Sequence, residues 1–403
     1  MIPWQFVNIT AGTGAPSLLS VGWPPVAYSL GVQGSQHVYY LAGQLVKVQG
    51  AVVDIDASVH ELWRGSHGWH HTDLTAALGL PLVTPAAGYA FDFYGTRHLV
   101  CFDMNSHIHE LRGDPGGWYH SDLTVDTGAP VGVPMTGYAF EAQRTGHVIY
   151  IDDAPTRHIH ELWWDTNGWH HNDLTAATGA PTGNAVGYAF EGSYTQHIFY
   201  SSSTDNHIHE LWWDAGGWQH SDLTAATGAP VSTWPFVRAY PFDAKATQHV
   251  LFVAGHQLHE LRWDTNGWRH DDLTALANAP DAAANGTPVG YAANAHGIRY
   301  VVYRGAGNDD HIHQLWRDNT RWQHRDLTTA TGAPSGMWPS AGYVSETADT
   351  QHIICTRTAS FEEQQEHIYE LRGPAQSMSP MWLPKPDLTP FPPFPKKLPP
   401  RLS

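Results

Sequence analysis

The sequence predicts an all-β protein, a seven-bladed β-propeller with four antiparallel strands in each blade, and three observations lead to this prediction. A unit of about 50 residues recurs seven times in the 403-residue chain. Each unit holds four short segments rich in aromatic and β-branched residues, as strands are. Gly, Pro, Asn, Asp or Ser separate the segments, and these residues form turns. Four strands in a repeat of this length are typical of a propeller blade.

The first two strands of each blade are predicted from two short phrases. Their clearest copies are Gly-Tyr-Ala-Phe-Glu at 187–191 and Gln-His-Ile-Phe-Tyr at 196–200. The tyrosines of the first phrase are Tyr28, Tyr89, Tyr138, Tyr188, Tyr240, Tyr291 and Tyr343. The histidines of the second are His37, His98, His147, His197, His249 and His352, with Arg299-Tyr300 in the remaining unit.

The third and fourth strands carry the strongest repeats. The third reads His-x-His-Glu-Leu, and its second histidine is His60, His109, His160, His209, His259 and His313, with Tyr369 in the last unit. The fourth reads Trp-x-His-x-Asp-Leu-Thr and begins at Trp69, Trp118, Trp169, Trp218, Trp268 and Trp322. We expect its Asp to cap the following turn through backbone N–H groups. A Thr-Gly-Ala-Pro link then starts the next unit.

Ring closure is assigned to the N-terminus. Residues 4–10 are a degenerate copy of the fourth strand, followed by their own Thr-Gly-Ala-Pro at 13–16. We therefore expect this N-terminal strand to complete the seventh blade. A rival copy, Trp382 with Asp-Leu-Thr at 387–389, is interrupted by two prolines, which confine it to a sheet edge. The sequence does not exclude this rival.

One propeller domain is predicted over 1–372, followed by a proline-rich tail over 373–403. Its blade units are the N-terminal strand 4–10 and, roughly, 17–75, 76–124, 125–175, 176–224, 225–274, 275–328 and 329–372. The first unit has 23 residues between its two histidine phrases, so residues around 41–58 are expected to form an extra loop or hairpin. The tail has the composition of a polyproline segment with a basic end.

Charge and composition narrow the class of partner. The net charge is −17 with histidine neutral, which argues against nucleic acid, because its binders need a basic surface. Protonating all 28 histidines would reverse the sign, so the charge is expected to change sign in mildly acidic medium. Cys101 and Cys355 are the two cysteines, too few for a disulfide framework. Neutral ligands are the expected partners.

Membrane and export signals are not apparent in the sequence. The N-terminus lacks the charged and apolar regions of a Sec leader, and no apolar run is long enough for a transmembrane helix. We expect a soluble protein that is synthesised in the cytoplasm and that can be released or act outside the cell. No membrane insertion is expected.

Three functional interpretations compete for the repeated residues. Sugar binding fits because Trp, Tyr, His, Asn and Asp offer aromatic platforms and fixed hydrogen-bonding groups without net charge. Metal binding is suggested by His-x-His at 107/109, 158/160, 207/209 and 311/313, with a fourth-strand histidine able to approach from the next strand. Structural histidines, bonded to backbone or to a neighbouring carboxylate, fit the same pattern better, so no metal and no cofactor is predicted. An enzyme is disfavoured because the acidic residues repeat as blade elements, without a unique nucleophile–base pair.

The four phrases together resemble the repeat of the Photorhabdus-type (PLL-like) seven-bladed propeller lectins. The resemblance covers roughly residues 1–372, hence all seven blades. It implies a secreted or released bacterial lectin, non-catalytic and multivalent, that binds L-fucose and O-methylated sugars in pockets between blades and forms dimers or tetramers.

Carried onto this chain, the resemblance places carbohydrate in pockets made by the fourth-strand tryptophans and the first-strand tyrosines. These residues are Trp69, Trp118, Trp169, Trp218, Trp268, Trp322, Tyr89, Tyr138, Tyr188 and Tyr240. Blades 2 to 5 match best, so fewer than seven working sites are expected, about four or five. The alternative function is a protein-binding propeller scaffold whose histidines make association depend on pH.

Overall fold

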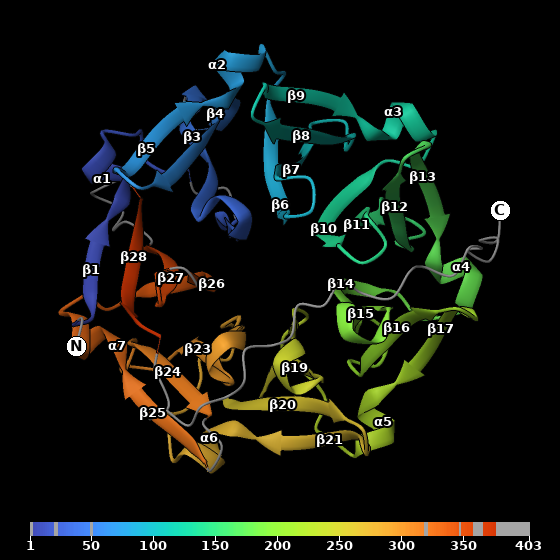
Figure 1. The fold of residues 1–403 in the computed structure, drawn as a ribbon, viewed down its shortest axis with the longest axis vertical. Coiled ribbons are helices and arrows are strands. Elements are labelled where there is room, and N and C mark those ends of the chain that lie inside the picture. The colour runs from blue at the N-terminus through green and yellow to red at the C-terminus, as the bar shows by residue number, and fades with distance from the viewer. Residues whose placement is uncertain are drawn as a thin grey trace.

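The chain forms a ring of seven four-stranded antiparallel sheets arranged like blades around a central axis (Figure 1). The computed structural model describes residues 3–19, 23–48, 51–317, 321–345, 348–357 and 366–375, and the side chains of 45–55 lie outside this description. In blades 1 to 6 the strands are paired in chain order from the inside of the ring outwards, and in blade 7 the outermost strand is the first strand of the chain. The predicted fold class is confirmed.

The strands of each blade have the following bounds. Blade 1 holds β2 (Val26–Leu30), β3 (Ser35–Val48), β4 (Ala51–Gly65) and β5 (Gly68–Asp73). Blade 2 holds β6 (Val83–Phe91), β7 (Thr96–Asp103), β8 (Ile108–Asp114) and β9 (Gly117–Asp122). Blade 3 holds β10 (Gly132–Phe140), β11 (Thr145–Asp152), β12 (Ile159–Asp165) and β13 (Gly168–Asp173). Blade 4 holds β14 (Gly183–Phe190), β15 (Thr195–Ser202), β16 (Ile208–Asp214) and β17 (Gly217–Asp222).

The remaining blades follow the same plan. Blade 5 holds β18 (Arg238–Phe242), β19 (Thr247–Ala254), β20 (Gln257–Asp264) and β21 (Gly267–Asp272). Blade 6 holds β22 (Val289–Ala293), β23 (Ile298–Arg304), β24 (Ile312–Arg317) and β25 (Trp322–Asp326). Blade 7 holds β26 (Met337–Ser345), β27 (Thr350–Arg357), β28 (His367–Pro374) and β1 (Gln5–Asn8). Short 3₁₀ turns lie at Gly31–Gln33, Glu191–Ser193, Asp243–Lys245 and Asn294–His296.

The N-terminal strand closes the ring, as predicted. β1 pairs antiparallel with β28, with Phe6 opposite Leu371 and Asn8 opposite Tyr369. The Phe6 and Tyr369 rings stack with their centroids 5.1 Å apart. The seventh blade is thus built from both ends of the described chain, and Figure 1 shows β1 lying beside β28. The rival copy at 382–389 lies outside the described residues.

Short helices follow the fourth strands and explain the Asp-Leu-Thr phrase. They are α1 (Ile9–Thr13), α2 (Leu74–Leu78), α3 (Leu123–Thr127), α4 (Leu174–Thr178), α5 (Leu223–Thr227), α6 (Leu273–Ala277) and α7 (Leu327–Thr331). In blade 3, Asp173 is the N-cap and accepts from the Ala176 N–H, which confirms the predicted capping role. Leu174 is buried, and the Thr175 hydroxyl accepts a hydrogen bond of 2.9 Å from the Ile159 N–H. Each residue of the phrase therefore has a structural task.

The core lies between blades rather than inside one. One apolar cluster joins Tyr138, Phe140 and Ile149 of blade 3 to Ile198 and Tyr200 of blade 4, for example. Both faces of each sheet are therefore covered by neighbours, which is why neither alternate set of residues along a strand is purely polar.

The extra residues of blade 1 form a hairpin, one of the two predicted outcomes. β3 and β4 extend past their counterparts and remain paired from Gln36–Arg64 out to Val48–Ala51. The tail from 376 onward lies outside the described residues. No helix in the described part of the chain is long and apolar enough to span a membrane.

Candidate functional site: clefts between the blades

A buried hydrogen-bonded relay recurs at the start of the second strand. In blade 2, the Thr96 hydroxyl lies 2.8 Å from His98 Nε2, and His98 Nδ1 lies 2.7 Å from Glu110 Oε1. Six blades repeat this relay, with Ser35–His37–Glu61, Thr145–His147–Glu161, Thr195–His197–Glu210, Thr247–His249–Glu260 and Thr350–His352–Glu370 in the others. Strand pairing brings the histidine and the glutamate together from neighbouring strands. The Gln-His and His-Glu-Leu phrases thus meet in space.

The first-strand tyrosine stacks on the relay histidine, and its hydroxyl points to the next blade. The Tyr138 ring lies 5.0 Å from that of His147, and its hydroxyl donates to Gln196 Oε1 at 3.1 Å. Tyr188 bonds Gln248 at 3.0 Å in the same way. The residue just before the next blade's second-strand histidine therefore faces the relay across the gap between blades. We call it the facing residue, and it is Gln36, Arg97, Gly146, Gln196, Gln248, Arg299 or Gln351.

Between blades 2 and 3 the facing residue is Gly146, and a cleft of 690 Å³ opens there, which we call cleft 2/3. A Cβ atom at Gly146 would lie 2.7 Å from the Tyr89 hydroxyl, so only a glycine leaves this space beside Tyr89 unfilled. Blade 3 contributes Trp164 and Trp169 to the walls, and blade 2 contributes several aromatic rings and the relay. The blade 2 residues include Tyr89, Phe91, Tyr94, Thr96, His98, Glu110, Arg112 and Tyr119.

Between blades 4 and 5 the equivalent residues line a smaller cleft of 330 Å³, cleft 4/5. Trp263 and Trp268 stand where Trp164 and Trp169 stand in cleft 2/3. The relay residues Thr195, His197 and Glu210 line it together with Gln248, the facing residue. Trp212 replaces Arg112 on the opposite wall. Both clefts therefore combine aromatic walls with buried donors and acceptors.

A third cleft, of 460 Å³, lies between blades 7 and 1 and has a different chemistry. Arg64 stands in the position of Trp164, and Arg372 in that of Arg112. Gln36 Nε2 lies 3.2 Å from His352 Nε2, which links the facing residue to the relay. Arg64 thus replaces an aromatic wall residue of both other clefts, whereas Arg372 replaces Trp212 of cleft 4/5 but matches Arg112 of cleft 2/3.

Arginine side chains occupy two of the remaining gaps. Between blades 1 and 2, the Arg97 guanidinium lies 4.8 Å from the Trp118 ring centre and donates to Glu61 at 3.2 Å. Between blades 5 and 6, Arg299 lies 4.7 Å from the Trp322 ring centre and donates to Glu260 at 2.5 Å. Each guanidinium covers one face of its tryptophan. The equivalent tryptophan of cleft 2/3, Trp169, is left open to the cleft.

The gap between blades 5 and 6 has the strongest electrostatic coupling. Burial raises the pKa of Glu260, but Arg299 and His249 outweigh it and lower that pKa to about 2. Burial, and next the Arg299 charge, lower the pKa of His249 to about 4. The fully buried Glu260 is therefore ionised beside a neutral imidazole and a charged guanidinium. Burial likewise lowers the pKa values of His37, His60, His71, His120, His160, His171, His220, His259 and His324.

These lowered values reduce the size of the charge change that the sequence predicts. The sequence estimate treated all 28 histidines as free to protonate in mildly acidic medium. Ten described histidines, His249 and the nine above, instead hold their protons less tightly than a free imidazole. The positive charge gained at a given mildly acidic pH is therefore smaller than the sequence predicts.

The sequence-derived sugar candidates fall into different surroundings. Trp169 and Tyr89 line cleft 2/3, and Trp268 lines cleft 4/5. Trp118 and Trp322 lie under arginine side chains. Tyr138, Tyr188 and Tyr240 are buried between blades, while Trp69 and Trp218 pack against apolar clusters. Whether any of them binds sugar stays a prediction.

The structure adds residues that the sequence analysis did not select for a site. The third-strand Trp164, Trp212 and Trp263 form cleft walls, and the facing residue decides whether a gap is filled. A signal for the walls was present, because Trp-Trp follows the His-Glu-Leu phrase in blades 3 and 4. Variation at the facing residue was equally visible, but its position opposite the preceding blade follows only from the ring geometry.

A hydroxyl–imidazole–carboxylate chain is also the arrangement of a hydrolytic triad. Here it occurs six times, with the hydroxyl and imidazole two residues apart on one strand, and the six histidine residues are 0–7% exposed. Such burial and repetition are what a rigid polar support for the sheet requires, since buried polar groups need partners.

The chain was compared with known proteins. No protein-family model and no curated protein matches it. Among solved structures, AofleA from Arthrobotrys oligospora has a TM-score of 0.48 at 16% identity, over 73% of this chain and 90% of its own. The Aleuria aurantia lectin, described as a six-bladed propeller with a fucose recognition mode, has 0.48 at 16%, over 77% and 96%. The propeller domain of the Trilobed protease from Pyrococcus furiosus has 0.49 at 6%, over 90% and 98%. These likenesses are too distant to add to the strand topology, and no functional argument rests on them.

Proposed function

We propose that the protein is a multivalent, non-catalytic lectin that binds neutral sugars in clefts 2/3 and 4/5. One observation carries the proposal: in both clefts two tryptophans of one blade face the hydroxyl, imidazole and carboxylate of the preceding blade's relay. A pyranose ring has an apolar C–H face that stacks on an aromatic ring and hydroxyls that need fixed partners. The clefts offer both.

The volumes suit small carbohydrates. Cleft 2/3 and cleft 4/5, at 690 and 330 Å³, fall within the ~300–1,000 Å³ usual for small-molecule pockets. The extra aromatic rings of cleft 2/3, Tyr94 and Tyr119, are 40% and 47% exposed and widen its stacking surface. Fucose-like or O-methylated sugars are our first assignment, because their methyl groups add apolar surface for such walls, and the repeat resemblance points the same way.

Two sites on one rigid ring raise avidity for a surface that displays many copies of the sugar, without any new contact. Glycans of this kind are displayed outside cells, so the proposal implies that the protein acts after release. The third cleft is not assigned to neutral sugars, because Arg64 takes the place of the third-strand tryptophan that lines both other clefts.

The test is a glycan-array screen of the full chain at neutral pH, with and without a chelator, followed by Trp169→Ala and Trp268→Ala. We expect chelator-insensitive binding, and a loss of tenfold or more in the affinity of the altered cleft, equivalent to about 1.4 kcal/mol. Trp118→Ala is the matched control, because Arg97 covers that ring. Silence on a broad array, with the protein shown to be folded, would favour the protein-binding scaffold instead.

A further inference from the structure

The His-x-His phrases lie at the other edge of the blades, away from the sugar clefts. In an antiparallel blade, the loop between the second and third strands and the end of the fourth strand lie at one edge. The turns that border the clefts lie at the opposite edge. In blade 4, His207 and His209 therefore meet Asp222, the N-cap of α5, at the edge remote from cleft 4/5.

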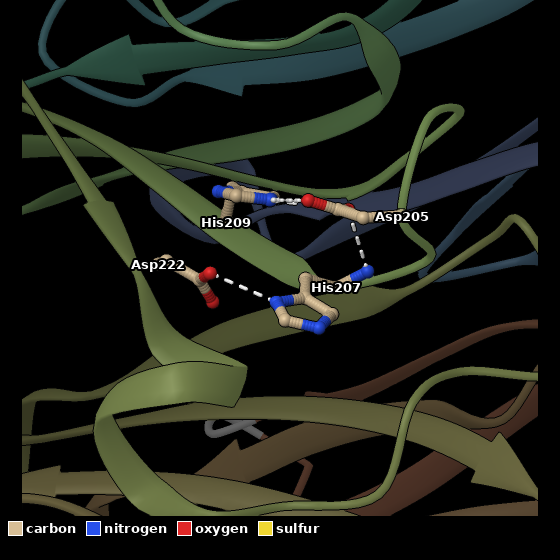
Figure 2. A group of neighbouring side chains, drawn as sticks. All are labelled: Asp205, His207, His209 and Asp222. Atoms are coloured by element: carbon tan, nitrogen blue, oxygen red, sulfur yellow. Dashed lines mark hydrogen bonds and ion pairs between the residues drawn. The ribbon is translucent and has the colours of Figure 1, made fainter.

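Four side chains of blade 4 converge at that edge (Figure 2). Asp205 lies in the loop before β16, and its carboxylate oxygens are each 3.4 Å from His209 Nε2. His207 Nδ1 lies 2.8 Å from Asp222 Oδ2. One nitrogen or oxygen of each residue can be chosen so that all four atoms lie within 4.8 Å of one another. Two imidazole nitrogens and two carboxylate oxygens form a ligand set that suits a divalent transition metal.

Blade 3 repeats the arrangement with His158, His160 and Asp173, whose ligand atoms also lie within 4.8 Å of one another. His160 is 3% exposed, and its Nε2 lies 3.5 Å from Asp152 Oδ2, too far for a well-formed hydrogen bond. A buried nitrogen without a close hydrogen-bond partner needs a reason, and a bound ion is one of the standard ones.

The first histidine lies 2.8 Å from the N-cap aspartate in both blades, whereas the longer contact of the second histidine with the loop carboxylate matches the spacing of ligand atoms around an ion. Tetrahedral Zn²⁺ with bonds of about 2.0–2.2 Å holds its ligand atoms about 3.4 Å apart. The nitrogen–oxygen distances from the second histidine to the loop carboxylate are 3.5 Å in blade 3 and 3.4 Å in blade 4. In blade 6 the equivalent pair, His313 and Asp309, is closed to 2.9 Å, an ordinary hydrogen bond.

The loop carboxylate accompanies the histidine pair. Blades 2, 3, 4 and 6 have both histidines and place Asp103, Asp152, Asp205 or Asp309 next to the second one. In blade 1, where Ser58 replaces the first histidine, its hydroxyl bonds His60 Nε2 at 2.7 Å instead. A histidine that only needed a buried partner could take a hydroxyl, as in blade 1.

We propose that blades 3 and 4 each bind one Zn²⁺ ion at this edge, through His158, His160 and Asp173 in blade 3 and through Asp205, His207, His209 and Asp222 in blade 4. In blade 4 the ion ties the loop before β16 to the start of α5. The role is structural, because in blade 4 the protein supplies four ligands and sugar binding at the opposite edge does not need the ion.

The test titrates Zn²⁺ alone into the metal-free full-length chain by calorimetry, and Co²⁺ by visible absorption, where tetrahedral sites give intense bands. We expect saturable binding that falls by one equivalent in Asp205→Asn and by one in His158→Gln. Asp205 is exposed, so its amide variant keeps the fold. Asp214→Asn is the matched control, because Asp214 caps the turn at the other edge of the same blade by accepting from the Gly216 N–H.

Absence of Zn²⁺ binding by the folded chain would overturn the proposal. An unchanged stoichiometry in both Asp205→Asn and His158→Gln would overturn it too, because the ions would then sit elsewhere. The result is separate from sugar binding, which the chelator arm of the glycan screen measures independently.

Discussion

Replacing Arg299 by Gln removes the charge that holds the gap between blades 5 and 6 together. Arg299 is 3% exposed, donates to Glu260 and lies over the Trp322 ring. Removing one partner of a buried ion pair typically costs about 3–5 kcal/mol, because the other charge is left in a medium of low polarity. We therefore expect Arg299→Gln to lower the free energy of unfolding by about 3–5 kcal/mol at pH 8.

The pH dependence makes this prediction specific. In the native protein the pKa of His249 is about 4, below its ordinary 6.5, so the unfolded chain binds more protons and stability from this group is lost as pH falls from 6.5 towards 4. Without Arg299 the pKa of His249 rises, because its partner is then Glu260 alone. The folded variant therefore binds a proton at His249 at pH values where the folded native protein does not. Each pH unit over which this holds narrows the difference by about 1.4 kcal/mol, so the difference shrinks by at most about 2.8 kcal/mol between pH 7.5 and pH 5.5.

The assay is chemical unfolding of both proteins across that pH range. The difference between their free energies of unfolding cancels the contributions of the other titrating groups, because both proteins contain those groups. Arg97→Gln is the matched comparison: Arg97 is more exposed and its contact with Glu61 is longer, at 3.2 Å, so its effect is expected to be smaller. A penalty for Arg299→Gln that stays constant with pH would refute the assigned coupling of His249 to Arg299.

Three further changes test the fold and the clefts. Gly146→Gln places a Cβ 2.7 Å from the Tyr89 hydroxyl, and we expect it to abolish sugar binding in cleft 2/3 while cleft 4/5 still binds, as counted by calorimetry with free monosaccharide. Asp272→Ala removes the N-cap of α6, and we expect a loss of about 1 kcal/mol of stability, measured by urea unfolding; no loss would contradict the capping role. Deleting residues 1–14 exposes the β28 edge, and we expect a lower melting temperature and self-association on size-exclusion chromatography, whereas an unchanged monomer would show that β1 is not needed for closure.

The blade architecture could be predicted from the sequence because its causes are local. The Asp-Leu-Thr phrase specifies a cap, a buried side chain and a hydroxyl that bonds the third strand, all within about 16 residues, as Ile159 and Thr175 show. Seven copies then leave ring closure as the way to cover every sheet face. The N-terminal strand was recognisable because it copies the same phrase, with Asn8 as the cap.

The clefts could not be predicted in the same way. Trp118 and Trp169 belong to the same repeat position, yet one lies under Arg97 and the other lines cleft 2/3. The difference lies in the facing residue, which is Arg97 beside Trp118 and Gly146 in cleft 2/3. The facing residue belongs to the blade after the one that holds the relay, so the two are far apart in the sequence. The repeat therefore determines which residue type occupies a position, and the neighbouring blade determines how exposed that residue is.

The sequence by itself determined the fold, the number of blades and the closing strand, because each depends on hydrogen bonds and burial within one repeat. Only the tertiary structure decided which gaps are open, which histidines are neutral and which carboxylates they meet. Those properties depend on side chains brought together across blades, where a single glycine or arginine changes volume and charge without altering the pattern of the strands.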